Sequence, residues 1–321
     1  MNSFTFYVTF HPKACPPEQP ITIGFERVTT SLLNSIKGYR RVFMHSGNWW
    51  RLSERIRTPS RILSSLRKLS EVCNVEGFMS INIPPKVDIQ NYDIWNLPKE
   101  IRERALKRSL EYADILLQSS PKTTLYCSYE VGTLEDSMKW YRIALEHGHV
   151  AFGAGFAGFL MGRIRVEAYK RMIEVIVGAR SVIGDKPFHA SGVASLKLLP
   201  IICYAGATSA DGSTPVRVAL AMGQVYDITG KAHGVLRLER WNCTCRMCSE
   251  YGREIIKLLK DDYNLRVRHN IEVWNENLAV MNEALREGRL EEYITRRIGR
   301  SPLLRKTFEY ARELRRRLLR R

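Results

Sequence analysis

The sequence contains no apolar run of about 18 residues, the least that a membrane-spanning helix needs. It contains no internal repeat and no low-complexity linker, so repeat arrays are not expected. No G-x-G-x-x-G motif follows an expected strand, which weakens the case for an open, nucleotide-binding sheet. Residues 1–10 are apolar and aromatic without a basic start or a cleavage site, so we expect a first strand there and not a signal peptide.

Acidic residues are scarce relative to basic ones. The sequence has 33 Asp and Glu and 50 Lys and Arg, which gives a formal net charge of +17. This excess predicts a polyanionic partner, most simply nucleic acid. A surface rich in ion pairs is the alternative, but such pairs would balance in sign. Residues 300–321 hold nine Lys and Arg, and Leu304, Phe308, Ala311 and Leu318 fall near helical spacing. This pattern predicts an amphipathic helix that is basic on its outer face.

Cysteine is infrequent, yet three of the seven cysteines, Cys243, Cys245 and Cys248, fall within six residues. His269 follows 21 residues after the third. Three thiolates and an imidazole complete a tetrahedral zinc set and leave no position open for water, so we predict a structural Zn²⁺ site. Ordinary buried thiols are the alternative interpretation. The other four cysteines stand alone, which fits a reducing compartment and a cytoplasmic protein.

The segment between the third cysteine and His269 is expected to be one helix that the metal pins to the cysteines. Its apolar residues fall near one face: Ile255, Leu258, Leu259 and Tyr263.

Short apolar runs alternate with helical patterns over most of the chain. Strands are expected at 41–44, 77–81, 124–127, 150–153, 187–190 and 205–208. Helices are expected at 60–73, 98–119, 134–147, 165–182 and 194–204. This alternation predicts an α/β fold, and the number of repeats favours a (β/α)₈ TIM-type barrel over an open, doubly wound sheet. We therefore expect a barrel domain over 1–238, and a zinc-binding subdomain with basic C-terminal helices, packed on the barrel, over 239–321.

Polar residues and glycines collect where the expected strands end. They are His45, Ser46, Gly47, Asn82, Ser128, Glu130, Gly155, Gly158, Gly192 and Asp211. Because the carboxyl ends of barrel strands meet on one face, these scattered residues predict a single site.

These segments, taken in order, resemble the tRNA-guanine transglycosylases. The cysteine cluster with His269-Asn270 and Glu287-Gly288-Arg289 resembles the zinc end of that family. Residues 206–217 resemble its nucleophile segment, in which an aspartate is followed four residues later by proline and then by x-Arg. Weaker likenesses, at 44–47, 81–84, 155–158 and 189–194, occur in the same order as in the family.

The resemblance implies a base exchange in nucleic acid. Asp211 would attack C1′ and displace guanine, and a free 7-deazaguanine base would then resolve the covalent glycosyl–enzyme intermediate. For Asp211 alone, a turn or helix-capping role is the alternative. The expected base-binding residues are Asn82, Ser46, Gly47, Ser128, Glu130, Gly155, Gly158 and Gly192.

Two expected site residues depart from the family pattern. His45 stands where the family carries an aspartate associated with base binding and proton transfer; histidine can move a proton near neutral pH, so His45 joins Asp211 as an expected catalytic residue. The alternative is a histidine that only supports its neighbours. Asn82 replaces the family's guanine-reading aspartate and offers one acceptor and one donor in place of two acceptors. The family's Gln-Gly segment has no clear counterpart, and Ser128 or Glu130 occupies that region.

The nature of the polynucleotide is less firmly indicated. Archaeal tRNA-directed members carry a C-terminal RNA-binding extension, and no segment of that length follows His269. Together with the altered base-reading residues, this favours DNA, as in the DpdA-like branch that inserts 7-deazaguanine derivatives into DNA. The alternatives are a compact tRNA-guanine transglycosylase, a non-catalytic nucleic-acid-binding paralogue or partner subunit, and an unrelated zinc-stabilised barrel enzyme. A homodimer is also compatible with the sequence.

Overall fold

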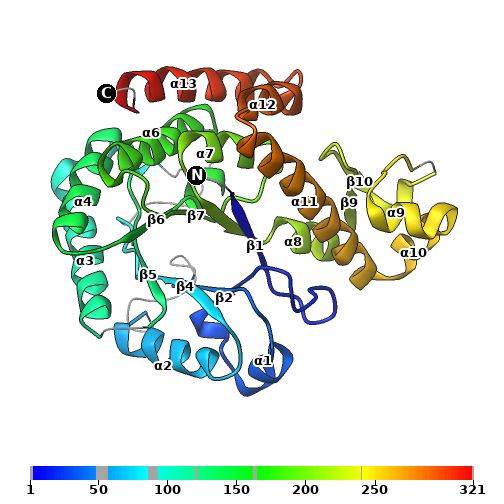
Figure 1. The fold of residues 1–321 in the computed structure, drawn as a ribbon, viewed down its shortest axis with the longest axis horizontal. Coiled ribbons are helices and arrows are strands. Elements are labelled where there is room, and N and C mark those ends of the chain that lie inside the picture. The colour runs from blue at the N-terminus through cyan, green and yellow to red at the C-terminus, as the bar shows by residue number, and fades with distance from the viewer. Residues whose placement is uncertain are drawn as a thin grey trace.

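Eight parallel strands close into a barrel in chain order, which confirms the predicted α/β barrel (Figure 1). The computed structural model describes residues 3–47, 57–85, 93–119, 122–161, 165–239 and 241–319. The strands are β1 (Thr5–Thr9), β2 (Ile21–Gly24), β3 (Val42–His45), β4 (Val75–Met79), β5 (Thr124–Tyr129), β6 (Ala151–Gly155), β7 (Phe188–Ser191) and β8 (Ser209–Gly212). The barrel closes where β8 pairs with β1, with Asp211 opposite Tyr7.

Helices surround the barrel on its outside (Figure 1). They are α1 (Thr30–Ser35), α2 (Pro59–Ser70), α3 (Lys99–Gln118), α4 (Leu134–Glu146), α5 (Ala157–Met161), α6 (Arg165–Ile183), α7 (Leu199–Ala205) and α8 (Thr214–Ala221). Local sequence signals explain where several of these helices begin. Thr58 caps α2 just before Pro59, and Thr133 caps α4 by accepting a hydrogen bond from the Asp136 backbone N–H at 3.1 Å. The helices expected near α2, α3, α4 and α6 are confirmed.

The strand expected at 205–208 is wrong. Helix α7 ends at Ala205, Gly206 caps it with a φ of 123°, and residues 206–208 form the turn before β8, which begins only at Ser209. Asp211 therefore lies within the last strand and does not follow it. A short apolar run does not distinguish a buried helix from a strand, and here the buried run 199–205 is helical. The helix expected from residue 194 accordingly begins later, at Leu199.

Inward-facing side chains fill the middle of the barrel. Tyr7, Phe43, Met79 and Tyr126 pack together, and the His189 ring stacks on Phe43 with a centroid distance of 4.1 Å. We call these five residues the barrel floor. An added Cβ at Gly77 would come within 2.7 Å of the Tyr126 ring, so the glycine makes room for that side chain. The barrel is thus packed below its carboxyl end and is not a pore.

The rest of the chain forms a hairpin and five further helices. They are β9 (Gln224–Tyr226), β10 (Ala232–Gly234), α9 (Arg246–Tyr251), α10 (Ile255–Asp261), α11 (Tyr263–Arg286), α12 (Leu290–Ile298) and α13 (Pro302–Leu319). Helix α11 packs against α8, and α13 lies along α6 (Figure 1). The division of the chain at residue 238 stays a prediction.

The single helix expected between Cys248 and His269 is wrong. Gly252, with a φ of 54°, ends α9, and Asp262 starts α11 by accepting a hydrogen bond from the Asn264 backbone N–H at 2.7 Å. Tyr263, expected on the apolar face, is 48% exposed because the helix restarts at that residue. The segment is helical, but a glycine and a capping aspartate divide it.

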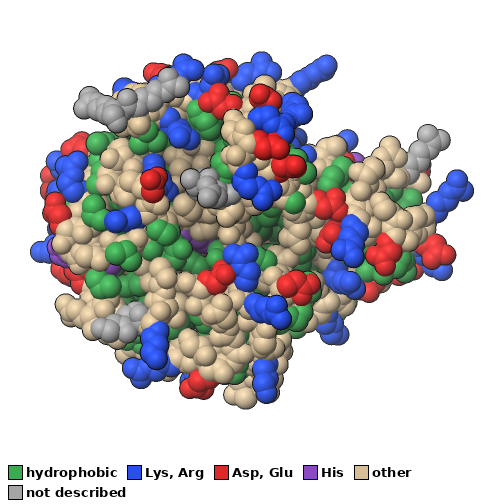
Figure 2. Space-filling view, viewed as in Figure 1, with side chains coloured by type: hydrophobic (Ala, Val, Ile, Leu, Met, Phe, Trp, Pro, Cys, Tyr) green, Lys and Arg blue, Asp and Glu red, His purple; other side chains and the backbone are tan. Residues whose placement is uncertain are grey.

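The expected amphipathic C-terminal helix is confirmed as α13. Leu304, Phe308 and Ala311 are buried, and Leu318 is half-buried. Lys and Arg side chains project from the edge of the molecule where α13 lies (Figure 2). Residues 320 and 321 of the expected tail lie outside the described ranges. None of the helices within those ranges combines the length and the apolar character that crossing a bilayer requires.

Candidate active site and metal centre

Asp211 lies at the carboxyl end of the barrel, where hydrogen bonds from two other segments hold its side chain in place. The residue is 3% exposed. Thr22 on β2 donates its hydroxyl to Oδ2 at 3.1 Å, and the backbone N–H of Gly192, after β7, donates to Oδ1 at 2.6 Å. The N-terminal cap of α8 is Ser213, so the side chain of Asp211 does not have the helix-capping role considered as its alternative. Both oxygens are therefore oriented by bonds across the barrel.

The surroundings of Asp211 keep it ionised. Burial alone would raise the pKa of its carboxyl. His189, whose Nε2 lies 3.8 Å from Oδ1, lowers this pKa, and so do His45 and the Gly192 N–H. Together these groups hold the pKa at about 2. A buried carboxylate that is charged at neutral pH and backed by a histidine has the properties of a nucleophile.

His45 ends β3 and is half-buried beside Asp211. Its Nδ1 accepts a hydrogen bond from the Gly47 backbone N–H at 3.0 Å, so the neutral ring carries its hydrogen on Nε2. Burial lowers the pKa of the imidazole, and the nearby carboxylates of Asp211 and Glu26 oppose that shift only in part. The ring is therefore a neutral hydrogen-bond donor at Nε2.

A second group of buried polar side chains surrounds Asn82. The Nδ2 of Asn82 donates to Glu130 Oε2 at 2.6 Å, while its Oδ1 accepts from Arg57 Nη2 at 2.9 Å. The Arg57 guanidinium also donates to the backbone oxygens of Asn82 and Ser46. Asn82, Glu130 and Arg57 are 6%, 2% and 2% exposed. Charges this deeply buried need partners, and this network supplies them.

Glycine at position 155 allows this group to form. An added Cβ there would collide with Glu130 Oε2 and come within 2.7 Å of Asn82 Nδ2. Ser128 lies near the end of β5, two residues before Glu130, and its hydroxyl is buried without a hydrogen-bond partner in the described part of the chain. Gly158 lies within α5 and not at a strand end. Most of the residues predicted for the site are thus gathered around either Asp211 or Asn82.

The predicted metal ligands form a compact, buried cluster. The three Sγ atoms of Cys243, Cys245 and Cys248 and the nearest ring nitrogen of His269 all lie within 4.8 Å of one another. Cys248 Sγ lies 3.2 Å from His269 Nε2, and Trp241 donates its indole N–H to the same sulfur at 3.0 Å. Three thiols and an imidazole converging in this way fit a tetrahedral metal ion. The group can hold a metal ion, and its donors are those that zinc prefers.

Comparison with known proteins places this barrel in a family. The sequence profile of queuine tRNA-ribosyltransferases matches residues 87–302, a stretch that includes Asp211 and the metal cluster. The chain belongs to this family.

Curated relatives in archaea carry the name tRNA-guanine(15) transglycosylase. The protein of Methanocaldococcus jannaschii is 23% identical over 325 residues, which cover 97% of this chain and 45% of that protein. The protein of Saccharolobus solfataricus is 23% identical over 229 residues, covering 70% and 44%. That of Sulfolobus acidocaldarius is 25% identical over 149 residues, covering 46% and 29%. The chain thus spans less than half the length of these relatives.

Three residues at the candidate site were not predicted from the sequence: Thr22, His189 and Arg57. Thr22 was missed because β2 was not predicted. His189 was seen only as part of a strand, although a histidine inside an expected barrel strand is a usable signal. Arg57 follows Ser46 by eleven residues, and nothing in its sequence context indicates that it is buried.

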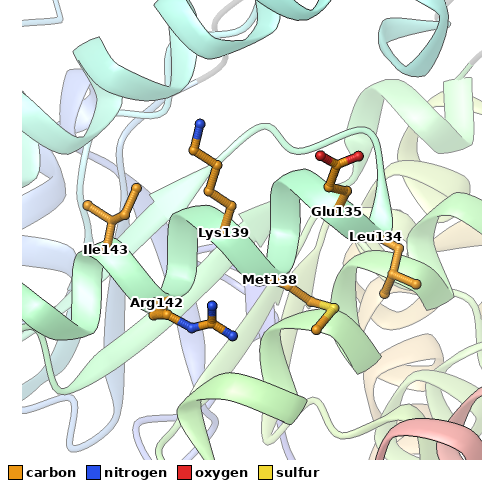
Figure 3. Close-up of a pocket in the computed structure, with 6 residues that line it drawn as sticks. All are labelled: Leu134, Glu135, Met138, Lys139, Arg142 and Ile143. Atoms are coloured by element: carbon orange, nitrogen blue, oxygen red, sulfur yellow. The ribbon is translucent and has the colours of Figure 1, made fainter.

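A hollow of about 620 Å³ lies apart from these groups, along the outer side of α4 (Figure 3). Its lining side chains all come from that helix: Leu134, Glu135, Met138, Lys139, Arg142 and Ile143. In Figure 3, Lys139 and Glu135 point to one side of the helix, and Arg142 and Met138 to the other. Side chains that diverge from one exposed helix do not converge on a ligand, so we assign no site here.

Proposed function

We propose that this chain is a base-exchange transglycosylase that replaces guanine in nucleic acid with a 7-deazaguanine derivative. The observation that carries the proposal is the buried, ionised Asp211, oriented by Thr22 and Gly192 at the carboxyl end of a barrel of this family. The names of the curated relatives support tRNA as the polynucleotide. The preference for DNA stays a prediction and forms the second arm of the test.

The chemistry follows from the state of Asp211. A carboxylate oxygen attacks C1′, a C–O bond forms, and the C1′–N9 bond breaks with its electron pair going to guanine. His45, as a neutral donor at Nε2, is suited to hydrogen-bond to a base as it accepts negative charge. In the second half, N9 of the incoming base gives its proton to solvent, from which the departed guanine takes one up. N9 then attacks C1′, and the bond from C1′ to the Asp211 oxygen breaks as the carboxylate leaves. The low pKa that keeps Asp211 ionised also makes it a good leaving group.

We assign Zn²⁺ to the cluster of Cys243, Cys245, Cys248 and His269 in a structural role. Four protein ligands close the coordination shell, so the ion would stabilise the fold and take no part in the exchange. The cluster joins the loop before α9 to α11, two segments that are separated along the chain.

Contact with nucleic acid is assigned in part to the exposed side of α13. Arg305, Lys306, Arg316 and Arg317 are exposed there. The remaining arginines of the helix have other tasks, because Arg312 pairs with Glu291 at 3.1 Å and the Arg315 guanidinium lies over the Tyr204 ring at 4.5 Å. Exposed cations of this kind bind phosphates and carry no sequence information.

The test is base exchange with isotopically labelled guanine. The full chain is incubated with unfractionated tRNA or with duplex DNA, and radioactivity in the polymer is measured together with any covalent protein–polynucleotide adduct after denaturation. We expect exchange and an adduct with tRNA, both lost in Asp211→Asn. The matched control is Asp185→Asn, an exposed aspartate in the loop before β7, which should behave like the parent.

Each outcome separates the candidates. Exchange with DNA alone would replace tRNA by DNA as the substrate. Exchange and an adduct that persist in Asp211→Asn would show that another residue is the nucleophile. A parent protein that forms no adduct and exchanges no guanine with either polymer would support the non-catalytic paralogue.

A further inference from the structure

The side-chain amide of Asn82 is already bonded within the protein at both ends. An arginine can only donate hydrogen bonds, and a carboxylate can only accept them. The amide oxygen must therefore face Arg57 and the amide nitrogen must face Glu130, as the distances of 2.9 Å and 2.6 Å show. Ser46 also points its hydroxyl at the same amide oxygen, at 3.5 Å. Asn82 is thus a bridge between a buried cation and a buried carboxyl group.

Glu130 is placed where a ligand above the barrel floor would meet it. Side chains along β5 alternate between the two faces, so Tyr126 of the floor and Ser128 lie on the same side. Glu130 directly follows the end of β5 and continues this series. Ser128 contributes a buried hydroxyl without a hydrogen-bond partner among the described residues. On the adjacent strand, Gly155 brings only backbone against the Glu130 carboxyl group.

We propose that Glu130, and not Asn82, is the group that recognises the exchanged base, and that Asn82 and Arg57 are positioning residues that hold it. The inference rests on the proposed function, since it names the base-reading residue of that same site. A guanine-type edge presents an N–H and an amino group as neighbouring donors, and a carboxylate is the acceptor that suits such a pair. The oxygen of Asn82 is occupied by Arg57 and cannot serve that purpose. The carboxylate expected at position 82 is therefore supplied from position 130.

This arrangement makes the two positions interdependent. Asn82→Asp alone would bring two carboxyl groups to the 2.6 Å separation that the amide and carboxylate now share. Like charges at that distance cannot both be accommodated, so the pair would separate or retain a proton. Glu130→Gln alone would leave two amides and no carboxylate. Exchanging both residues places the carboxyl group at position 82, facing Arg57, and leaves an amide at position 130.

The experiment is a double-mutant cycle on the full chain, made of the parent, Asn82→Asp, Glu130→Gln and the double variant. The dissociation constants of free guanine and of 7-deazaguanine are measured by calorimetry without any polynucleotide. Glu130→Gln should weaken both by about 10- to 100-fold, the range that follows loss of hydrogen bonds to a charged group. Asn82→Asp should weaken them as well, because it displaces Glu130. The double variant should bind no better than Glu130→Gln, because its carboxyl group stands at position 82, where it faces Arg57. Glu146→Gln, an exposed glutamate at the end of α4, is the matched control and should bind like the parent.

Failure of this inference is distinct from failure of the proposed function. Additive losses would overturn the positioning role of Asn82, and recovery of binding in the double variant would show that a carboxylate at position 82 reads the base. Parent-like binding by Glu130→Gln, in a protein that melts like the parent, would overturn the assignment of Glu130. If the parent exchanges guanine but the cycle is additive, the function stands and this inference falls. If the losses of base affinity are non-additive but no exchange occurs, the inference stands and the function falls. A parent that binds neither base overturns both.

Discussion

Asn270 donates its side-chain Nδ2 to the backbone oxygen of Pro215 at 3.0 Å, and its Oδ1 accepts the Tyr226 backbone N–H at 2.9 Å. Asn270 follows the metal-cluster residue His269 in α11, and Pro215 lies four residues after Asp211 at the start of α8. One fully buried side chain therefore joins the helix of the metal cluster to the segment that carries the proposed nucleophile.

Replacing Asn270 should therefore destabilise the protein without removing its metal. Asn270→Ala removes the partner of the Tyr226 backbone N–H and the bond to the Pro215 carbonyl, at a cost of about 1–3 kcal/mol in the free energy of unfolding. Urea unfolding and metal analysis check this. Asn275→Ala is the control, because this half-buried residue of the same helix makes one side-chain hydrogen bond, to Gln19, and its loss should cost about 1 kcal/mol. A loss of metal in Asn270→Ala would contradict the separation of the two roles.

Removing one cysteine of the cluster should lower metal content and stability together. Cys245→Ser leaves three ligands, and the folding free energy that metal binding contributes would fall by several kcal/mol. Zinc is measured by atomic absorption and the melting temperature by calorimetry. Cys73→Ser is the control, because that half-buried thiol only donates to the Leu69 carbonyl, which a serine can also do. A Cys245→Ser protein that lost zinc but melted like the parent would show that the cluster does not support the fold.

The depressed pKa of Asp211 should appear in the pH dependence of stability. A carboxyl group whose pKa is about 2 when folded and about 3.8 when unfolded stabilises the fold above the unfolded value. This contribution, about 2 kcal/mol, is lost as the pH falls from about 4 to about 2. The difference in unfolding free energy between the parent and Asp211→Asn should therefore shrink over that window and stay constant from pH 5 to 7. A difference that changed mainly above pH 5 would contradict the assigned shift.

The exposed cations of α13 should affect binding to nucleic acid and leave the fold intact. Replacing Arg305, Lys306, Arg316 and Arg317 by glutamine should reduce the slope of log K against log salt concentration by up to about 3–4 if all four contact phosphates. The melting temperature should not change. Arg315→Gln is the contrasting variant, because its loss of contact with Tyr204 should lower the melting temperature. An unchanged salt slope in the fourfold variant would show that α13 serves only the fold.

Deleting the whole helix would not separate these roles. Leu304, Phe308, Ala311 and Leu314 are buried, and α13 packs along α6 and α7. Removing that apolar face would expose part of the core, so a deletion would lose binding through unfolding.

The sequence by itself determined the cluster of three cysteines and a histidine, and the face of the barrel on which the candidate site lies. Three cysteines within six residues are close in any fold, and a histidine on a following helix completes the set. The alternation of strands and helices predicted a barrel, and a barrel brings all its strand ends to one side. Both inferences need only local patterns, which is why Asp211, Asn82 and Glu130 could be named together.

Only the tertiary structure decided which of these side chains touch and what each one does. Thr22 and Asp211 are 189 residues apart and meet because β8 closes the barrel against β1, beside β2. The orientation of the Asn82 amide depends on Arg57 and Glu130, which come from different segments. A hydrogen bond requires two particular atoms within about 3 Å, and sequence periodicity fixes only the face on which a side chain lies. The contact between Asn82 and Glu130 is therefore a property of the closed barrel.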